Sequence, residues 1–318
     1  METRKLYYED PFQKGFATTV VSCDAVKGGY AVVLAETAFY PEGGGQPYDT
    51  GVLGEANVLE VHEKGGVITH LCDKPFEVGK SVSGKIDWAR RFDHMQQHSG
   101  EHICSGLICE RFHCDNVGFH MGADVVTIDF NADISWDELM EIEQLANLYI
   151  YEDHPIDIQF YRGAELDKVE YRSKKPLEGD VRIVSFPGAD CCACCGTHVV
   201  RSGQVGLVKF LSVQKFRDGV RIELLSGKRA HRYLSECWAQ DVRIAQALSV
   251  KPNASFAGVE RVLAELSALK QRCAKLEESV FAQTAAQYEG KGDVLLFEDE
   301  MSGDSLRKLC DAVTNHCG

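Results

Sequence analysis

The chain has 318 residues, which at about 150 residues per domain predicts roughly two domains. Lysine and arginine number 34 and aspartate and glutamate 48, so the formal net charge is −14. Binding of nucleic acid through bulk positive charge is therefore excluded, although a local basic face is not. A hydrophobic content of 44% excludes disorder of the whole chain.

Cysteine usage and hydropathy indicate the compartment. No apolar stretch reaches the ~18 residues needed to span a bilayer, and the N-terminus lacks the apolar core of a signal peptide. We therefore expect a cytoplasmic protein without membrane contact. Thiols stay reduced in that compartment, so clusters among the 13 cysteines favour metal binding or catalysis over disulfides.

The pattern along residues 1–227 predicts an α+β fold. Residues 1–87 are β-rich, with short alternating runs such as 30–35 and 58–62 between glycine turns. From residue 88 the pattern changes, and Trp88 to about Phe112 has helical spacing of its apolar residues. These two regions read as separate structural domains.

A strand and a capped helix follow. Residues 125–130 predict a strand, and Ser135 with Glu138 predicts a capping box at the start of a second helix. Strands and turns return from about 156 to 225. The apolar residues expected on the buried face of the second helix are Leu139, Ile142, Leu145 and Leu148.

The last third of the chain predicts a helical arm. A helix over about 228–248 ends before Lys251-Pro252-Asn253, and a heptad seam follows over 259–280. Together they predict an antiparallel helical hairpin over 228–290, with the seam closed within the chain or in a homodimer. A strand at 294–297 and a helix at 305–316 are too little to close a domain, so we expect residues 291–318 to be part of a larger domain. The seam consists of Val259, Val262, Leu266, Leu269, Cys273, Leu276 and Val280.

The first helix carries three histidines four residues apart. Side chains at this spacing share a helix face about 6 Å apart, so one pair can hold one cation. All three together span roughly 12 Å, which is too far for a single ion. The pair is therefore His94 with His98 or His98 with His102.

A cysteine cluster supplies the complementary ligands. Residues 190–198 contain four cysteines and His198, and Cys194-x-x-x-His198 offers one thiolate and one imidazole. With a histidine pair this gives three nitrogens and one sulfur, a plausible tetrahedral Zn²⁺ set. A four-cysteine zinc site starting from Cys191-x-x-Cys194 lacks a second C-x-x-C partner, and a redox pair lacks the strand that should lead into a helix.

These motifs, in this order, resemble a known family. The H-x-x-x-H and C-x-x-x-H halves are similar to those of the alanyl-tRNA synthetase editing domain and of the freestanding alanyl-tRNA editing proteins, the AlaX group. The likeness is closest to the long form of that group and covers about residues 5–232. The segments that carry it are 98–102, 194–198, the glycine-rich 39–46 with 49–51, and 117–122, 206–210 and 219–223.

The resemblance implies a domain order and a ligand set. It implies an N-terminal β-barrel over 1–87, a zinc-binding editing domain over 88–227 and, beyond the arm, the start of a DHH-associated domain over 291–318. The family register selects His98 and His102, which makes His94 an outer or substrate-side group. Cys195 stands where the family has glycine, so Cys194 and Cys195 are both candidates, and the spacing to His198 favours Cys194.

The resemblance further implies hydrolysis of the ester in misacylated tRNA(Ala), chiefly seryl and also glycyl. Glu101 and His120 are the candidates for proton handling, with a solvated helix position as the other interpretation of Glu101. Gly43, Gly44 and Gly45 would let the tRNA end approach the backbone, although an ordinary turn would also use them. Further candidates for substrate contact are Gln46, Thr197 and Arg221.

A basic segment fits a tRNA partner. Residues 209–232 hold seven lysines and arginines against two acidic residues, so 7 − 2 gives +5. Met1 leads straight into the glycine-motif region, which favours the freestanding form. The competing interpretation is a non-catalytic tRNA-binding or dimerisation module with a structural zinc. A threonyl-type editing domain shares the metal signature but not the glycine-rich motif before the zinc helix.

Overall fold

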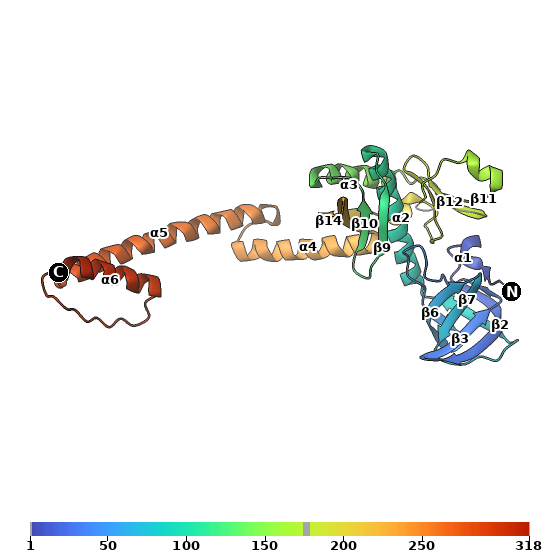
Figure 1. The fold of residues 1–318 in the computed structure, drawn as a ribbon, viewed down its shortest axis with the longest axis horizontal. Helices are drawn as coiled ribbons and strands as arrows, with labels where there is room; N and C mark the ends of the chain where they lie inside the picture. The colour runs from blue at the N-terminus through green and yellow to red at the C-terminus, as the bar shows by residue number, and fades with distance from the viewer. Residues whose placement is uncertain (1, 174–178, 318) are drawn as a thin grey trace. The chain divides into compact units, whose positions relative to one another are not determined.

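The computed structural model describes residues 2–173 and 179–317, which fall into two compact units, Met1–Leu234 and Ser235–Gly318. Helices and strands are both present, as the α+β prediction requires (Figure 1). Met1 and Gly318, at which the first and last predicted domains begin and end, lie outside the described residues.

Six antiparallel strands of the first unit close into a barrel, in the order β2-β3-β7-β6-β5-β8. Pairing of β8 with both β5 and β2 closes the ring, so the barrel leaves no free sheet edge. Alternate residues of the strands point inward and form an apolar core that includes Val20, Leu34 and Val61. The barrel strands are β2 Gly15–Val26, β3 Gly29–Leu34, β5 Gly51–Leu53, β6 Ala56–Lys64, β7 Val67–Cys72 and β8 Ser81–Ile86. A short parallel pair, β1 Arg4–Lys5 with β4 Glu36–Thr37, and helix α1 Leu6–Glu9 accompany them.

The rest of the first unit is built from two sheets and two long helices. One sheet has the order β14-β15-β10-β9 and the other β11-β12-β13. The first sheet comprises β9 Asn116–Met121, β10 Val126–Phe130, β14 Val208–Phe216 and β15 Gly219–Ser226. The second comprises β11 Asp157–Arg162, β12 Asp180–Phe186 and β13 Asp190–Ala193, and the helices are α2 Trp88–Phe112 and α3 Trp136–Tyr151. Two 3-10 turns, η1 Gly163–Lys168 and η2 Ser202–Val205, connect these elements.

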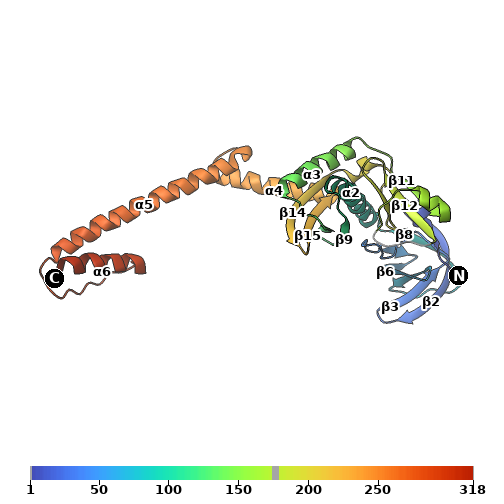
Figure 2. The same cartoon turned by 45° about the horizontal axis from the view of Figure 1, so that its top comes forward.

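Helix α2 lies at the centre of this region, with α3 and both sheets around it (Figure 2). It has the predicted bounds and begins at an Asp87 N-cap, whose carboxylate accepts a hydrogen bond from the Arg90 amide. One of its buried side chains, the Arg91 guanidinium, is paired with the Asp49 carboxylate, and neither side chain is exposed to solvent. This buried pair ties α2 to the barrel.

The predicted capping box at the start of α3 is confirmed. The Glu138 amide donates to the Ser135 hydroxyl at 3.3 Å, and the Ser135 amide donates to the Glu138 carboxylate at 2.9 Å. The predicted buried face is only half right, because Leu145 and Leu148 are exposed. At 3.6 residues per turn the stripe drifts, and the residues that are buried are Leu139, Ile142, Ala146, Tyr149 and Ile150.

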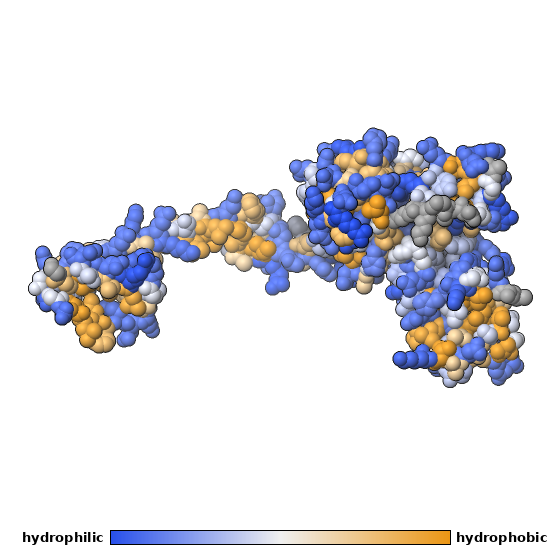
Figure 3. All heavy atoms as spheres, in the orientation of Figure 1, coloured by the Kyte–Doolittle hydropathy of each residue, from blue (hydrophilic) through white to orange (hydrophobic). Residues whose placement is uncertain are grey.

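The second unit contains most of α4 Gly227–Leu248, the 3-10 turn η3 Pro252–Ala254, α5 Ser255–Gln287 and α6 Gly303–Cys317. The antiparallel hairpin predicted from α4 and α5 is wrong. The two helices touch around their connecting turn, where the Arg261 guanidinium donates to the Leu248 carbonyl at 3.0 Å. Apolar side chains of the heptad seam stay exposed along α5 (Figure 3), from Val259 at 37% to Val280 at 55%.

Helix α5 packs instead against α6. Phe281 and Ala285 of α5 form a small core with Leu309 and Val313 of α6. The strand predicted at 294–297 does not form, because nothing in the described chain pairs with it and a lone strand cannot satisfy its backbone groups. None of the described helices is long and apolar enough to cross a membrane.

Candidate metal centre

Three histidines and one cysteine converge beside the middle of α2. His98 and His102 come from α2, and Cys194 and His198 come from the segment after β13; their ligand atoms all lie within 4.8 Å of one another. The Cys194 Sγ lies 3.4 Å from His98 Nε2 and 3.3 Å from His198 Nε2. A tetrahedral zinc with Zn–S and Zn–N bonds of ordinary length requires about 3.5 Å between sulfur and nitrogen. The arrangement therefore fits a single zinc ion.

Each histidine of the group has its Nδ1 occupied, so its Nε2 is the nitrogen left to bind metal. The Nδ1 of His98 donates to Gln46 Oε1 at 2.9 Å, and the Nδ1 of His102 donates to Asp190 Oδ2 at 2.8 Å. The Nδ1 of His198 approaches the Ser99 hydroxyl at 3.4 Å. Such outer partners fix the tautomer and the orientation of metal-binding histidines.

The loop geometry separates the two candidate cysteines. The Gly196 amide donates to the Cys194 sulfur at 3.3 Å, whereas the Cys195 side chain is exposed and lies outside the group. A Cβ at Gly196 would stand 2.1 Å from Cε1 of the His98 ring, so only glycine fits between the loop and that ring. Among the described residues each possible metal group contains a single cysteine, which disfavours the four-cysteine alternative.

The electrostatics of the group favour a cation. Burial by itself raises the pKa of the Cys194 thiol, but the charge of the neighbouring histidines outweighs it and holds the pKa well below its usual value. Burial lowers the pKa of His198 to about 3. Burial also acts to lower the pKa of His102, but Cys194 and the Asp190 carboxylate raise it well above its usual value. The site thus favours a Cys194 thiolate beside a positive charge. Zinc binds thiolate and neutral imidazole, so a bound zinc ion would take the place of the His102 proton.

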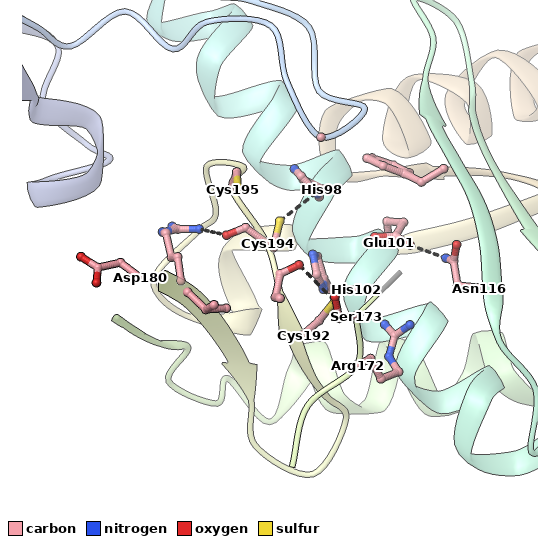
Figure 4. A pocket seen from close by; sticks show the side chains of 15 residues that line it. His98, Glu101, His102, Asn116, Arg172, Ser173, Asp180, Cys192, Cys194 and Cys195 are labelled. Atoms are coloured by element: carbon pink, nitrogen blue, oxygen red, sulfur yellow. Dashed lines mark hydrogen bonds between the residues drawn. The ribbon is translucent and has the colours of Figure 1, made fainter. Parts of the chain in front are cut away.

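A cavity of about 440 Å³ opens beside the four residues. Figure 4 shows His98, His102 and Cys194 at its wall, with Glu101 on the next face of the helix. Glu101 is 5% exposed, and its Oε1 accepts hydrogen bonds from the Ser105 hydroxyl at 2.6 Å and from the Asn116 amide at 2.9 Å. The interpretation of Glu101 as a solvated helix residue is therefore wrong.

Two of the other predicted site residues, His120 and Arg221, lie away from the metal group. His120 is exposed on β9 and does not line the cavity; its neighbour Phe119 does, stacked on His98 with ring centroids 4.9 Å apart. Strand alternation directs the two side chains to opposite faces. Arg221 pairs with Asp129 at 2.7 Å and lies over the Phe216 ring. The structure therefore does not bring His120 or Arg221 to the metal group.

Gln46 and Thr197 are fully buried behind the ligands and do not face the cavity. Gln46 Oε1 accepts from the Thr197 amide at 3.0 Å as well as from His98, and Gln46 Nε2 donates to the Thr197 hydroxyl at 2.9 Å. These two residues hold the barrel's glycine-rich loop against both halves of the metal group. Their contacts are those of supporting residues.

Within the glycine-rich loop the three glycines differ. Gly44 has a φ of +58° and lines the cavity. A Cβ at Gly45 would meet the Phe119 ring at 2.6 Å, so that glycine is needed for packing. Gly43 closes the turn through hydrogen bonds with Gln46 in both directions. Only Gly44 has the open position expected for close approach of a substrate.

Sequence reasoning missed the residues that support the group from outside. The Arg172 guanidinium holds the Asp190 carboxylate with two hydrogen bonds, at 2.7 and 2.8 Å, and Asp190 in turn orients His102. The Arg182 guanidinium donates to the Cys194 carbonyl at 2.7 Å and lies over the Tyr8 ring. Asp190 directly precedes the cysteine cluster, which was a usable signal, whereas the arginines carry no local motif.

Comparison with known proteins agrees with this geometry. A family model described as tRNA synthetases class II (A) matches residues 12–90, and one described as threonyl and alanyl tRNA synthetase second additional domain matches residues 181–223. The alanine–tRNA ligase of Pyrococcus abyssi is 36% identical over 340 residues, which cover 98% of this chain and 36% of the ligase. The chain thus spans about a third of the length of that ligase.

Two relatives match over most of their own length. The alanyl-tRNA editing protein Aarsd1-A of Xenopus laevis is 30% identical over 89% of this chain and 73% of its own length. The alanyl-tRNA editing protein AlaX-L of Pyrococcus horikoshii is 30% identical over 94% of this chain and 75% of its own. With both halves of the metal group and the glycine-rich loop in place, the chain belongs to the family of alanyl-tRNA editing proteins.

Proposed function

We propose that this protein is a trans-editing hydrolase that cleaves the ester of misacylated tRNA(Ala), chiefly Ser-tRNA(Ala) and also Gly-tRNA(Ala). The observation that carries the proposal is the buried group of three histidines and Cys194 at the wall of a cavity. Family membership supports the same activity. The ligands that we assign to Zn²⁺ are His98, His102, Cys194 and His198.

The chemical need for such an enzyme follows from the size of the amino acids. A pocket shaped for alanine cannot exclude glycine, which is smaller, and it rejects serine poorly because serine adds only a hydroxyl. Differences of this kind are worth ~1–3 kcal/mol, or 10–200-fold in rate. A second site that hydrolyses the wrong ester supplies the missing discrimination.

The metal would supply one part of the chemistry. Zinc held by these four residues would supply Lewis-acid chemistry, polarising an ester carbonyl or holding the substrate in place. The protein supplies the rest by position: Phe119 and Arg182 narrow the cavity, and Gly44 leaves its wall open to the substrate.

Glu101 is the residue that we assign to proton handling. Its Oε1 is held by Ser105 and Asn116, and no hydrogen bond to its Oε2 is found within residues 2–173 and 179–317. A carboxylate that lines the cavity and is fixed through one of its oxygens can accept a proton or bind the substrate's ammonium or hydroxyl group.

The test is deacylation of Ser-, Gly- and Ala-tRNA(Ala) by the zinc-loaded protein, the zinc-stripped protein and Glu101→Gln. We expect release of serine and glycine by the loaded protein, little release of alanine, and a loss of ~10²–10⁴-fold in Glu101→Gln if the carboxylate transfers a proton. An intact Glu101→Gln fold, checked by zinc content and thermal unfolding, keeps the comparison valid.

The alternative, a non-catalytic tRNA-binding or dimerisation module with a structural zinc, gives a different pattern. In that case zinc removal unfolds the domain and none of the three esters is cleaved by any form of the protein. The cavity beside the metal group and the buried Glu101 favour the hydrolase, since a purely structural zinc needs neither.

We also propose the division into a barrel over 1–87, an editing domain over 88–227, an arm over 228–290 and the start of a DHH-associated domain over 291–318. The exposed seam of α5 supports a homodimer through the arm. Light scattering of the full chain tests this, and Leu266→Glu with Leu269→Glu is expected to shift a dimer to a monomer.

A further inference from the structure

A second polar cavity, of about 430 Å³, lies one helical turn along α2 from the metal group. Helix α2 contributes Arg90, Asp93 and His94, the turn after β9 contributes Gly122 and Ala123, and the start of α4 contributes three basic residues. Those three are Lys228, Arg229 and Arg232, and Pro47 of the glycine-rich loop and Ala89 complete the lining. All of these residues belong to the first compact unit.

The charge of this cavity is unbalanced. Its four lysine and arginine side chains face a single carboxylate, Asp93, and that carboxylate is already held by Arg229 at 2.7 Å. The third Arg229 nitrogen donates to the Gly122 carbonyl, so Arg229 is committed to the wall. No carboxylate of the lining pairs with Lys228 or with Arg90, whose Nε donates to the Tyr48 carbonyl at 3.0 Å.

His94 supplies an independent sign of a missing partner. Its side chain is 2% exposed and lines the cavity, and its Nδ1 is buried without a hydrogen-bond partner in the described chain. Burial, together with the charge of Arg90 and Arg229, lowers its pKa to about 3, which reflects the same positive surroundings. Buried polar atoms are nearly always paired, so an orphan in a cationic cavity indicates an absent acceptor-rich ligand.

We propose that this cavity binds a phosphate group, namely a backbone phosphate of the tRNA acceptor end whose acylated terminus lies in the metal-side cavity. The proposal rests on the proposed function. The two cavities share the glycine-rich loop and α2, with Gly44 and His98 in one and Pro47 and His94 in the other. His94 and His98 are one turn, about 6 Å, apart along the helix, which suits neighbouring parts of one nucleotide.

The basic residues at the start of α4 supply the side chains that can contact a phosphate in this cavity. Lys228 is exposed, and its backbone amide is held by the Gln96 side chain at 3.2 Å, so its ammonium can move to a phosphate while the backbone stays fixed. Much of the predicted basic segment is already paired with acids, as in Lys209 with Glu143 at 2.8 Å. The part of the segment that lines this cavity is its end, from Lys228 to Arg232.

The test compares small esters that differ only in one phosphate: 3′-O-seryl-adenosine and 3′-O-seryl-adenosine 5′-monophosphate. We expect the wild type to hydrolyse the phosphorylated ester with a kcat/KM about tenfold higher, in keeping with one charge-assisted contact. Lys228→Gln and Arg232→Gln should bring the ratio toward one without changing hydrolysis of the unphosphorylated ester. Lys215→Gln, an exposed lysine on β14 away from the cavity, is the matched control.

A binding measurement tests the phosphate site independently of whether the protein hydrolyses the ester. Adenosine 5′-monophosphate should bind more tightly than adenosine by calorimetry, and Lys228→Gln should remove that preference even if no ester is cleaved. A ratio of one in the wild type, or a preference unchanged in both variants and in His94→Gln, overturns the proposal. Inorganic phosphate binding with the same affinity as the nucleotide would assign the cavity to free phosphate and also overturn it.

Discussion

Replacing Gly196 with alanine tests how tightly the loop and the metal-binding helix are fitted together. The added Cβ would stand 2.1 Å from Cε1 and 2.2 Å from Nδ1 of the His98 ring, where ordinary contacts begin at 3.4 Å. The ring cannot simply slide away, because its Nδ1 is held by Gln46 and its face is stacked on Phe119. It must therefore retreat by about 1 Å or more.

A shift of this size is large for a metal ligand, because zinc–ligand distances are held within about 0.2 Å. We expect Gly196→Ala to lower zinc affinity by at least 10–100-fold, the loss typical when the outer support of a ligand is disturbed. The φ of Gly196 is not positive, so the effect is steric rather than a matter of backbone strain.

The assay is competition with a chromophoric chelator, with metal content measured on the purified protein. Gly15→Ala is the matched control, since a Cβ there would make only an ordinary contact at 3.6 Å and its φ is also not positive. Thermal unfolding of the metal-free proteins shows whether the fold is kept. If Gly196→Ala bound zinc as tightly as the wild type, the assignment of His98 as a ligand in this geometry would be refuted.

Three further predictions concern buried titratable groups. Asp49→Ala leaves the fully buried Arg91 without its partner and should lower the free energy of unfolding by about 3–5 kcal/mol. Glu141→Ala breaks an exposed pair with Arg111 and should lower it by no more than about 1 kcal/mol, so equal losses in denaturant titrations would contradict the prediction. Burial lowers the pKa of His70 to about 4, so between pH 6.5 and 4 this histidine is protonated in the unfolded chain but neutral in the folded barrel. Its contribution to the free energy of unfolding is therefore complete above pH 6.5 and falls by on the order of 3 kcal/mol as the pH drops toward 4. His70→Gln should remove that part of the dependence of stability on pH, as measured by denaturant titrations. Because the pKa of His102 is raised in the metal-free site, zinc binding at neutral pH should release a proton and strengthen as pH rises; calorimetry in buffers of different ionisation heat measures this, and a heat independent of buffer would show the reasoning wrong.

Local signals in the sequence were sufficient for much of the fold. The Ser135–Glu138 pair and the spacing after Asp87 act within one helical turn, so they predicted the starts of α3 and α2. The predicted strand at 294–297 failed because a strand depends on a distant partner, which apolar composition does not report. The exposed seam of α5 shows the same limit: the heptad pattern predicts a helix that needs a neighbour but not which neighbour.

The candidate site, like the fold, could be predicted from the sequence only in part. Histidine and cysteine spacing indicated a metal site but left two histidine pairs open, and the family resemblance selected His98 and His102 over His94. The structure places His98 and His102 together with Cys194 and His198. The structure leaves His120 outside because strand alternation, not sequence proximity, decides which side chain of β9 faces the cavity. The support of His102 by Asp190 and Arg172 joins three separate segments, and no local pattern predicts such a contact.

The central claim is that the protein has a zinc-dependent esterase site in which Cys194 is a metal ligand. The most direct measurement is release of serine from Ser-tRNA(Ala), against release of alanine from Ala-tRNA(Ala), by the wild type, Cys194→Ala and Cys195→Ala, with zinc content determined for each. We predict fast serine release and one zinc in the wild type and in Cys195→Ala, and loss of both in Cys194→Ala. Undiminished serine release by a zinc-free Cys194→Ala, or no release by the zinc-loaded wild type, would contradict the claim.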